Sequence, residues 1–253
     1  MFGMRRRKGI EELQIPLADI HCHILPNLDD GARDKDMALE MLRQSYEEGI
    51  RLIVFTPHVR KPWLDVSEKQ VHEVFEEIRR EVQTEYPDLH CYLGSEVYFT
   101  RELYEEHRDK IRRMNETDYL LVEFSTACTY ADVEYAISRL LSDGYLPVIA
   151  HIERYACLWS SWELLKRLKR MGAYLQVNAG TVDHPIDRQQ RKQIEALLQE
   201  EMIDFIATDA HDLQRRKPLM QSCAQRIHLL CGEAYAKKVC YTNAVRLIEG
   251  KWL

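Results

Sequence analysis

The chain has 253 residues, of which 45% are hydrophobic and 30% are charged, an ordinary composition for a folded globular protein. Only 10 Gly and 8 Pro are present, which excludes a collagen-like chain and a long disordered one. The net charge of −6 argues against a general nucleic-acid-binding protein, because such proteins neutralise phosphates with an excess of Lys and Arg, but it leaves room for a local basic pocket that binds one phosphate.

Short β-rich segments alternate with amphipathic helical segments along the chain. The pattern predicts a strand at Leu17–His21 and then a helix over Lys35–Glu48, which ends at Gly49. A buried strand at Ile50–Thr56 follows, and Ser67 is positioned to cap the next helix. Further strands are predicted at His90–Glu96, Asp118–Phe124, Leu146–His151, Ala173–Asn178 and Ile203–Thr208, and further helices at Glu102–Arg113, Ala131–Asp143, Ser161–Met171, Asp187–Glu201 and from about Arg216 onward.

This alternation of strand and helix indicates parallel strands with helices outside them, as in a doubly wound sheet or a closed barrel. The chain has neither an internal repeat nor a linker rich in Pro, Gly or Ser. We therefore expect an α/β protein with an N-terminal extension at residues 1–16 and a single domain at residues 17–253.

Targeting and membrane signals are weak in this sequence. The basic residues 4–8 are not followed by the apolar segment of a signal peptide, and the longest apolar runs are too short to cross a bilayer. The seven cysteines contain no C-x-x-C pair, and scattered thiols are typical of a reducing compartment. We expect a cytoplasmic protein without membrane insertion.

Side chains that can bind metal follow nearly every predicted strand. In barrels of parallel strands the carboxyl ends of the strands share one face, where active sites lie. Residues two apart in an extended chain point to the same side, so His21 and His23 can hold one cation, and Asp209 and His211 repeat this spacing. The candidate ligands are His21, His23, Asp30, His58, Glu96, Glu123, His151, Asp209 and His211.

The chemistry of this set indicates a metal cluster. Imidazole nitrogens mixed with carboxylate oxygens suit Mn, Fe or Zn. The candidates exceed the about four to six ligands that one ion takes, so we expect two or three ions. Closely spaced ions generate a nucleophile from water at neutral pH and hold a phosphoryl oxygen from both sides, which favours phosphoester hydrolysis.

Two arginines follow candidate ligands closely. Arg154 comes three residues after His151, and Arg216 comes five residues after His211. A guanidinium group binds phosphate through paired hydrogen bonds, so both are candidate phosphate-binding residues. A surface salt bridge is the alternative interpretation of each.

A cysteine and an arginine have the C-x5-R spacing of cysteine-dependent tyrosine phosphatases. These residues are Cys240 and Arg246. That chemistry needs a loop of backbone N–H groups around the phosphate, whereas the intervening Y-T-N-A-V has no Gly and lies in a predicted helix. We therefore interpret the spacing as coincidence.

The order and spacing of six segments resemble a known family. The segments are D-I-H-C-H-I-L-P-N-L-D-D-G-A, T-P-H, G-S-E-V-Y, Y-L-L-V-E-F, P-V-I-A-H-I-E-R and A-T-D-A-H-D. From Asp19 nearly to the C-terminus, the chain is similar to the bacterial manganese-dependent protein-tyrosine phosphatases of the CpsB/YwqE type, in the polymerase-and-histidinol-phosphatase (PHP) superfamily. The resemblance implies a distorted seven-stranded (β/α) barrel.

The resemblance also implies roles for the candidate residues. Arg154 and Arg216 match the phosphate-contacting arginines of the family, and a hydroxide that bridges metal ions would attack phosphorus directly. The substrate would be phosphotyrosine on the Tyr-rich tail of a bacterial tyrosine kinase that controls capsule or exopolysaccharide synthesis. Three Mn2+ ions would be bound, the first by His21, His23, Glu96 and Asp209, the second by Glu96, Glu123 and His151, and the third by Asp30, His58 and His211.

The chain departs from the family pattern near the expected active site. Ser125 and Thr126 follow Phe124 where the family often has a Phe-Pro-like segment, and Ile152 stands where the family often has Pro. These departures bear on substrate preference. Three alternatives stay open: a small-molecule phosphoesterase resembling histidinol phosphatase, an amidohydrolase-type metal hydrolase, and a non-catalytic scaffold.

Overall fold

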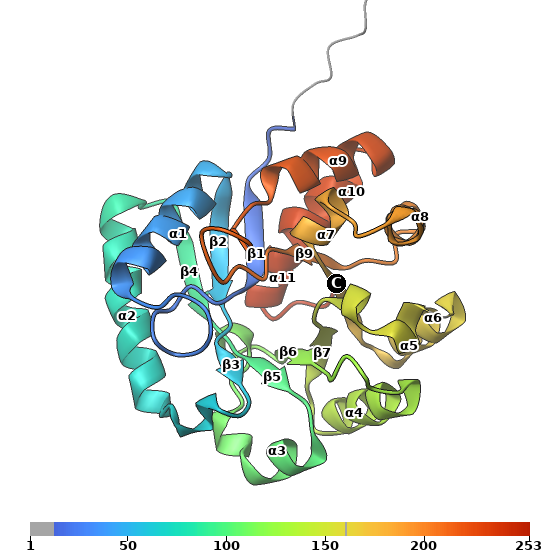
Figure 1. Ribbon diagram of the computed structural model, residues 1–253, viewed down its shortest axis with the longest axis horizontal. Helices are drawn as coiled ribbons and strands as arrows, with labels where there is room; N and C mark the ends of the chain where they lie inside the picture. Colours follow the sequence, from blue (N-terminus) through green and yellow to red (C-terminus); the bar gives the residue numbers. More distant parts are fainter. Residues whose placement is uncertain (1–12, 160) are drawn as a thin grey trace, which may run out of the picture.

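The computed structural model describes residues 13–159 and 161–253, so most of the predicted N-terminal extension at residues 1–16 lies outside the described residues. Parallel strands occupy the middle of the molecule and helices surround them (Figure 1). No helix in the described part of the chain is long and apolar enough to cross a membrane.

The strands form two sheets whose neighbours are all parallel. The first sheet has the order β1-β2-β4 and the second β3-β5-β6-β7-β8-β9. The strands are β1 Leu17–Cys22, β2 Ile50–Phe55, β3 His58–Val59, β4 His90–Leu93, β5 Glu96–Tyr98, β6 Tyr119–Glu123, β7 Leu146–Ile149, β8 Tyr174–Asn178 and β9 Phe205–Ala207.

The second and third predicted strands each differ from the prediction by a break in the chain's pairing. The second predicted strand, Ile50–Thr56, corresponds to β2, and an additional short strand, β3, follows after Pro57, which has no N–H to donate to a neighbouring strand. The third breaks between β4 and β5 at Gly94 and Ser95. Backbone hydrogen bonds continue across both breaks, from Gly94 to Phe55 (2.8 Å) and from Glu96 to Pro57 (3.2 Å).

The parallel α/β architecture is confirmed, whereas a single closed seven-stranded sheet is not found among the described residues. Between β1 and the segment that follows β9, an isolated bridge joins Cys22 to Ala210, and the backbone N–H of Asp209 donates to His21 O (2.8 Å). Strand β9 is three residues long, which leaves little edge for β1 to pair with.

The helices lie close to their predicted positions, with two exceptions. Helix α3 ends at Glu106, because only Leu103 and Tyr104 of that segment are buried and a longer helix would have no apolar face. Helix α9 begins at Gln221 because Pro218 disfavours helix before it. The helices are α1 Lys35–Glu47, α2 Glu68–Glu85, α3 Arg101–Glu106, α4 Tyr130–Ser142, α5 Ala156–Trp159, α6 Trp162–Met171, α7 Ala179–Asp183, α8 Arg188–Gln199, α9 Gln221–Cys231, α10 Glu233–Lys237 and α11 Asn243–Ile248.

Strand β6 shows how the core supports the polar groups at the carboxyl ends of the strands. All its residues are buried, and alternate side chains enter two different apolar clusters. Leu120 and Val122 join the larger cluster, whereas Tyr119 and Leu121 join a smaller cluster that also contains Ala244 of α11. Glu123 ends the strand and points to the same side as Tyr119 and Leu121, so apolar side chains packed in the smaller cluster support its carboxylate.

Candidate metal centre

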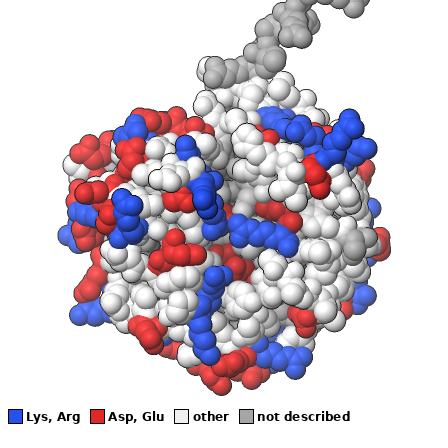
Figure 2. All heavy atoms as spheres, viewed as in Figure 1, with Lys and Arg blue, Asp and Glu red and all other residues white. Residues whose placement is uncertain are grey.

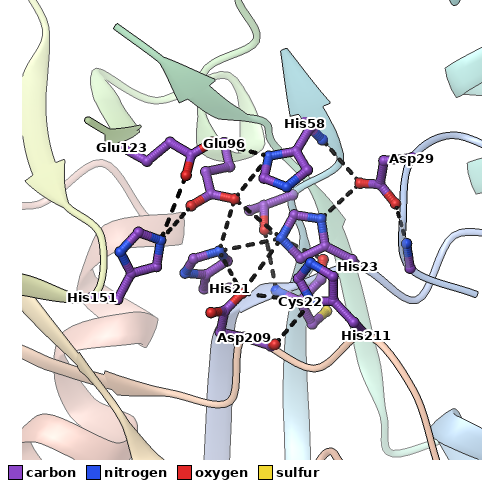
Figure 3. A network of polar contacts seen from close by, with 12 residues as sticks. His21, Cys22, His23, Asp29, His58, Glu96, Glu123, His151, Asp209 and His211 are labelled. Atoms are coloured by element: carbon purple, nitrogen blue, oxygen red, sulfur yellow. Dashed lines mark hydrogen bonds and ion pairs between the residues drawn. The ribbon is translucent and has the colours of Figure 1, made fainter. Parts of the chain in front are cut away.

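The nine candidate ligands come together at the carboxyl ends of the strands, although the chain separates them by up to 190 residues. Figure 3 shows imidazole and carboxylate groups from β1, β3, β5, β6 and the segments after β7 and β9 pointing toward one another. The side chains are at most 6% exposed, apart from Asp30, which is 43% exposed at the edge of the group.

The ligand atoms form three groups in which all atoms lie within 4.8 Å of one another. The groups overlap at His23, His58 and Glu96. His151 lies outside them, but its Nε2 atom is 2.9 Å from Glu96 Oε1 and 3.8 Å from Glu123 Oε2. The groups are His21, His23, Glu96 and Asp209; His23, Asp30, His58 and His211; and His58, Glu96 and Glu123.

The carboxylate of Glu96 lies at the middle of the cluster. Its Oε2 atom is 3.1 Å from Nε2 of His21 and 3.1 Å from Nε2 of His23. The same oxygen is 3.0 Å from Nδ1 of His58. Yet Glu96 Oε2, His58 Nδ1 and Asp209 Oδ1 are buried without a hydrogen bond to any described residue. Buried polar atoms are normally satisfied, so this donor set fits a bound cation.

The tight loop after β1 explains why a glycine follows two aspartates in the D-D-G-A motif. The backbone oxygen of His23 accepts a hydrogen bond from Ala32 (3.0 Å), which folds the loop back onto the strand. A Cβ atom at Gly31 would lie 1.9 Å from that same oxygen, so only glycine fits there. The fold of this loop brings Asp29 and Asp30 to the cluster.

Asp29 is a site residue that the sequence reasoning missed. Its Oδ2 atom is 2.7 Å from Nδ1 of His23, and it accepts a hydrogen bond from the backbone N–H of His58 (3.0 Å). Its Oδ1 atom accepts from the backbone of Gly31 (3.0 Å). Such a carboxylate orients a ligand histidine and makes its other nitrogen more basic. Its place beside Asp30 in the sequence was the available signal.

Strand β8 supplies two further polar residues that sequence reasoning missed. Gln176 Oε1 is 3.2 Å from Nδ1 of His21 and accepts from the backbone N–H of His151 (2.7 Å). Asn178 donates to Asp209 Oδ2 (2.9 Å). Their spacing of two residues at a strand end is the same signal that identified His21, but amides are weak indicators of a metal site.

Two candidate ligands have strained backbones. His151 has a φ of 32° and Asp209 a φ of 54°, both in the left-handed region that costs non-glycine residues about 1–3 kcal/mol. The Tyr155 hydroxyl, 3.2 Å from Nδ1 of His151, holds that ring in place. Strain held in this way clusters at functional sites, which agrees with the position of these residues.

The charges of the cluster change the pKa values of its members. Burial alone would lower the pKa of His21 and His58, but the nearby Glu96 carboxylate outweighs it and raises the pKa of His21 to about 9 and that of His58 to about 10. Burial lowers the pKa of His211 to about 4. Burial, together with the charge of Glu96, raises the pKa of Glu123. Without a cation, therefore, the cluster holds protons between its carboxylates and imidazoles.

Arg154 and Arg216 both reach the cluster. The Nη2 atom of Arg154 is 2.5 Å from Asp209 Oδ2, and Arg216 pairs with the same oxygen. The Arg154 and Arg216 side chains are 38% and 35% exposed, so each contacts the buried Asp209 carboxylate and also reaches solvent. Both arginines form ion pairs, as the alternative interpretation expected, but with a carboxylate that is 1% exposed and belongs to the cluster. A third arginine, Arg60, was missed; its Nη1 atom is 3.0 Å from Glu123 Oε1.

The coincidental C-x5-R spacing has no phosphatase geometry. Cys240 is fully buried, and burial raises the pKa of its thiol. The Nε atom of Arg246 donates a hydrogen bond to the backbone oxygen of Trp252 (2.8 Å). Cys22, between His21 and His23, is also buried, and its thiol donates to Val54 O (3.7 Å), so it packs in the core.

Comparisons with known proteins agree with this geometry. A tyrosine-protein phosphatase, CpsB of Streptococcus agalactiae, is 30% identical over 246 residues, 94% of this chain and 100% of the relative. A solved structure also matches, with a TM-score of 0.82 at 29% identity. It comes from a study of YwqE from Bacillus subtilis and CpsB from Streptococcus pneumoniae, which are described as unique metal-dependent tyrosine phosphatases. That match covers 94% of this chain and 96% of the other.

A more distant match shares the fold alone. The histidinol phosphate phosphatase of Lactococcus lactis has a TM-score of 0.54 at 16% identity, covering 87% of this chain and 93% of the other. In contrast, the family model described as capsular polysaccharide synthesis, CpsB/CapC, matches residues 17–249. The chain therefore belongs to the CpsB/CapC family of capsular polysaccharide synthesis.

Proposed function

We propose that this protein is a metal-dependent phosphotyrosine-protein phosphatase. The observation that carries the proposal is the buried Glu96 carboxylate, which is surrounded by imidazoles, has an oxygen without a hydrogen bond, and lies in a cluster edged by two arginines. Membership of the CpsB/CapC family and the resemblance to tyrosine phosphatases over most of the chain support the same activity.

The proposed centre holds three cations in overlapping ligand sets. When bound, they would supply Lewis acidity to the phosphoryl oxygens and lower the pKa of water toward neutrality. Mn2+ is the metal we propose, with Fe and Zn as the other ions that this mixture of nitrogen and oxygen ligands suits. The sets are His21, His23, Glu96 and Asp209; Glu96, Glu123 and His151, beside His58; and Asp30, His58 and His211.

The proposed catalytic and substrate-binding residues are Arg154 and Arg216. Both guanidinium groups meet at Asp209 Oδ2 and both are partly exposed, so a phosphate beside Asp209 would come within their reach. Planar guanidinium groups bind two phosphate oxygens at once, and they stabilise negative charge that develops during transfer. Asp209 therefore both binds a cation and positions the arginines.

The proposed substrate is phosphotyrosine on the Tyr-rich tail of a bacterial tyrosine kinase that controls capsule or exopolysaccharide synthesis. The family description and the names of the relatives favour this substrate over histidinol phosphate, since the histidinol phosphatase shares only the fold. A cytoplasmic location fits the thiols, because no described cysteine forms a disulfide.

The test is phosphate release from a phosphotyrosine peptide whose sequence is that of a Tyr-rich tail. We expect activity with Mn2+, loss after chelation, recovery when Mn2+ is restored, and resistance to vanadate concentrations that inhibit cysteine-dependent phosphatases. Histidinol phosphate and a dihydropyrimidine-type amide, assayed in parallel, test the alternatives. Faster turnover of either one, with no release from any phosphotyrosine peptide, would overturn the proposal.

A further inference from the structure

A cavity of about 450 Å³ opens beside the proposed phosphate site, near β9 and α7. Arg154 and Arg216 line its inner side, so the cavity and the metal centre share these two residues. Arg215 and Lys217 add two more cations, and Asp183 is the one carboxylate among the described residues of the lining. Figure 2 shows Lys and Arg side chains bordering a central group of Asp and Glu on this face.

The cations of this cavity are only partly neutralised. Asp209 pairs with Arg154 and Arg216, but Arg215 and Lys217 are exposed and form no ion pair within residues 13–159 and 161–253. The carboxylate of Asp183 accepts a hydrogen bond from the Ser222 hydroxyl. The lining is therefore strongly positive, although the whole chain carries a net charge of −6.

The loop that carries these cations is held in place by hydrogen bonds. Asp212 Oδ1 accepts from the backbone N–H groups of Gln214 (2.6 Å) and Arg215 (2.6 Å). The backbone oxygen of Arg216 accepts from His211 (2.9 Å), a candidate metal ligand. The position of Arg215 and Lys217 is thus tied to the metal centre itself.

We propose that this cavity is an anion subsite, formed by Arg215 and Lys217 with Arg154 and Arg216 at its inner edge. It binds a second anionic side chain of the substrate, a carboxylate or a phosphate on a residue near the phosphotyrosine. This inference rests on the proposed function and adds the class of peptide that the enzyme prefers. The cavity is of the size that binds whole small ligands, so it has room for a side chain beyond the reacting phosphate.

The test uses three phosphotyrosine peptides that differ only beside the phosphotyrosine: one has two Glu, one has two Gln, and one has a second phosphotyrosine. The variants are Arg215→Ala/Lys217→Ala and a matched control, Arg191→Ala/Lys192→Ala, which removes two exposed cations from α8, outside the cavity. Two quantities are compared, kcat/KM and the Kd of versions that carry a non-hydrolysable phosphonate.

We expect the wild-type protein to prefer the Glu peptide over the Gln peptide by about fivefold, the effect of two exposed ion pairs. The preference should shrink at high salt, fall to near onefold in Arg215→Ala/Lys217→Ala, and persist in the control. A preference confined to the second phosphotyrosine also supports the subsite and identifies phosphate as its ligand.

Two results would overturn the subsite: no preference in the wild-type protein, or a preference that Arg215→Ala/Lys217→Ala retains. Failure of the proposed function is a separate result, namely no hydrolysis of any peptide. In that case the Kd ratios of the phosphonate peptides still decide whether the anion subsite exists.

Discussion

Asp29→Asn tests whether a carboxylate that binds no cation itself controls the metal centre. Asp29 contacts three groups: Nδ1 of His23 and the backbone N–H groups of His58 and Gly31. A carboxylate offers two acceptor oxygens, whereas an asparagine offers one oxygen and an NH2 group that can only donate. At least one of these contacts must therefore be lost, and His23 loses the negative charge that makes it a stronger ligand.

The expected loss of Mn2+ affinity can be set from other carboxylates that hydrogen-bond to a metal ligand without binding the metal. Their removal usually lowers metal affinity or activity by about 10- to 100-fold, which corresponds to about 1.4 to 2.7 kcal/mol. Asp29 should lie at the upper end, because its side chain is 1% exposed and its contact with His23 is 2.7 Å long. The hydrogen bond combines a short distance with burial, and water cannot replace it there.

The assay is calorimetric titration of metal-free protein with Mn2+, together with phosphatase activity as a function of Mn2+ concentration. We expect Asp29→Asn to bind Mn2+ more weakly and to recover part of its activity at high Mn2+. The control is Asp65→Asn, at an exposed aspartate outside the cluster. Thermal unfolding of the metal-free proteins separates loss of affinity from loss of folding. Unchanged Mn2+ affinity in a folded Asp29→Asn protein would refute the reasoning.

Four other changes have defined outcomes. Asp209→Asn should lose bound metal, which elemental analysis measures. Its activity should fall by at least about 100-fold, the upper end of the effect of removing a group that only hydrogen-bonds to a metal ligand; a full metal content would contradict this. Arg154→Ala should keep its metal but lose about 10- to 150-fold in kcat/KM, the effect of a charge-assisted hydrogen bond, and an unchanged value would remove Arg154 from the site. His21 and His58, with metal-free pKa values raised to about 9 and about 10, are protonated at pH 7.5 and must lose protons to bind cations. Mn2+ affinity should thus rise between pH 7 and pH 10, and binding at pH 7.5 should release protons. Calorimetry in buffers of different ionisation enthalpy measures this release; binding without proton release would be inconsistent with the raised pKa values. Cys240→Ala should keep the activity of the wild-type protein, and its loss in a folded variant would reopen cysteine chemistry.

Much of the metal centre could be predicted from the sequence because its ligands follow a local rule. Side chains two residues apart in an extended segment point the same way, so the pair His21 and His23 was visible without a structure. The alternation of strands and helices placed Glu123 and His151 on the same face, since parallel strands end at a common edge. These inferences need only the geometry of the backbone and the hydrophobic pattern.

Other features depend on contacts between distant segments, which no local pattern reports. Gln176 orients His21 across 155 residues of sequence, and Arg154 meets Arg216 at one carboxylate oxygen of Asp209. The short strands β3 and β5 and the single bridge that joins Cys22 to Ala210 likewise follow from how whole segments pair. The sequence alone thus determined which residues could bind metal, because residue chemistry and strand period are local. The tertiary structure decided which groups orient them and where the cationic cavity lies, because those depend on how separate loops pack together.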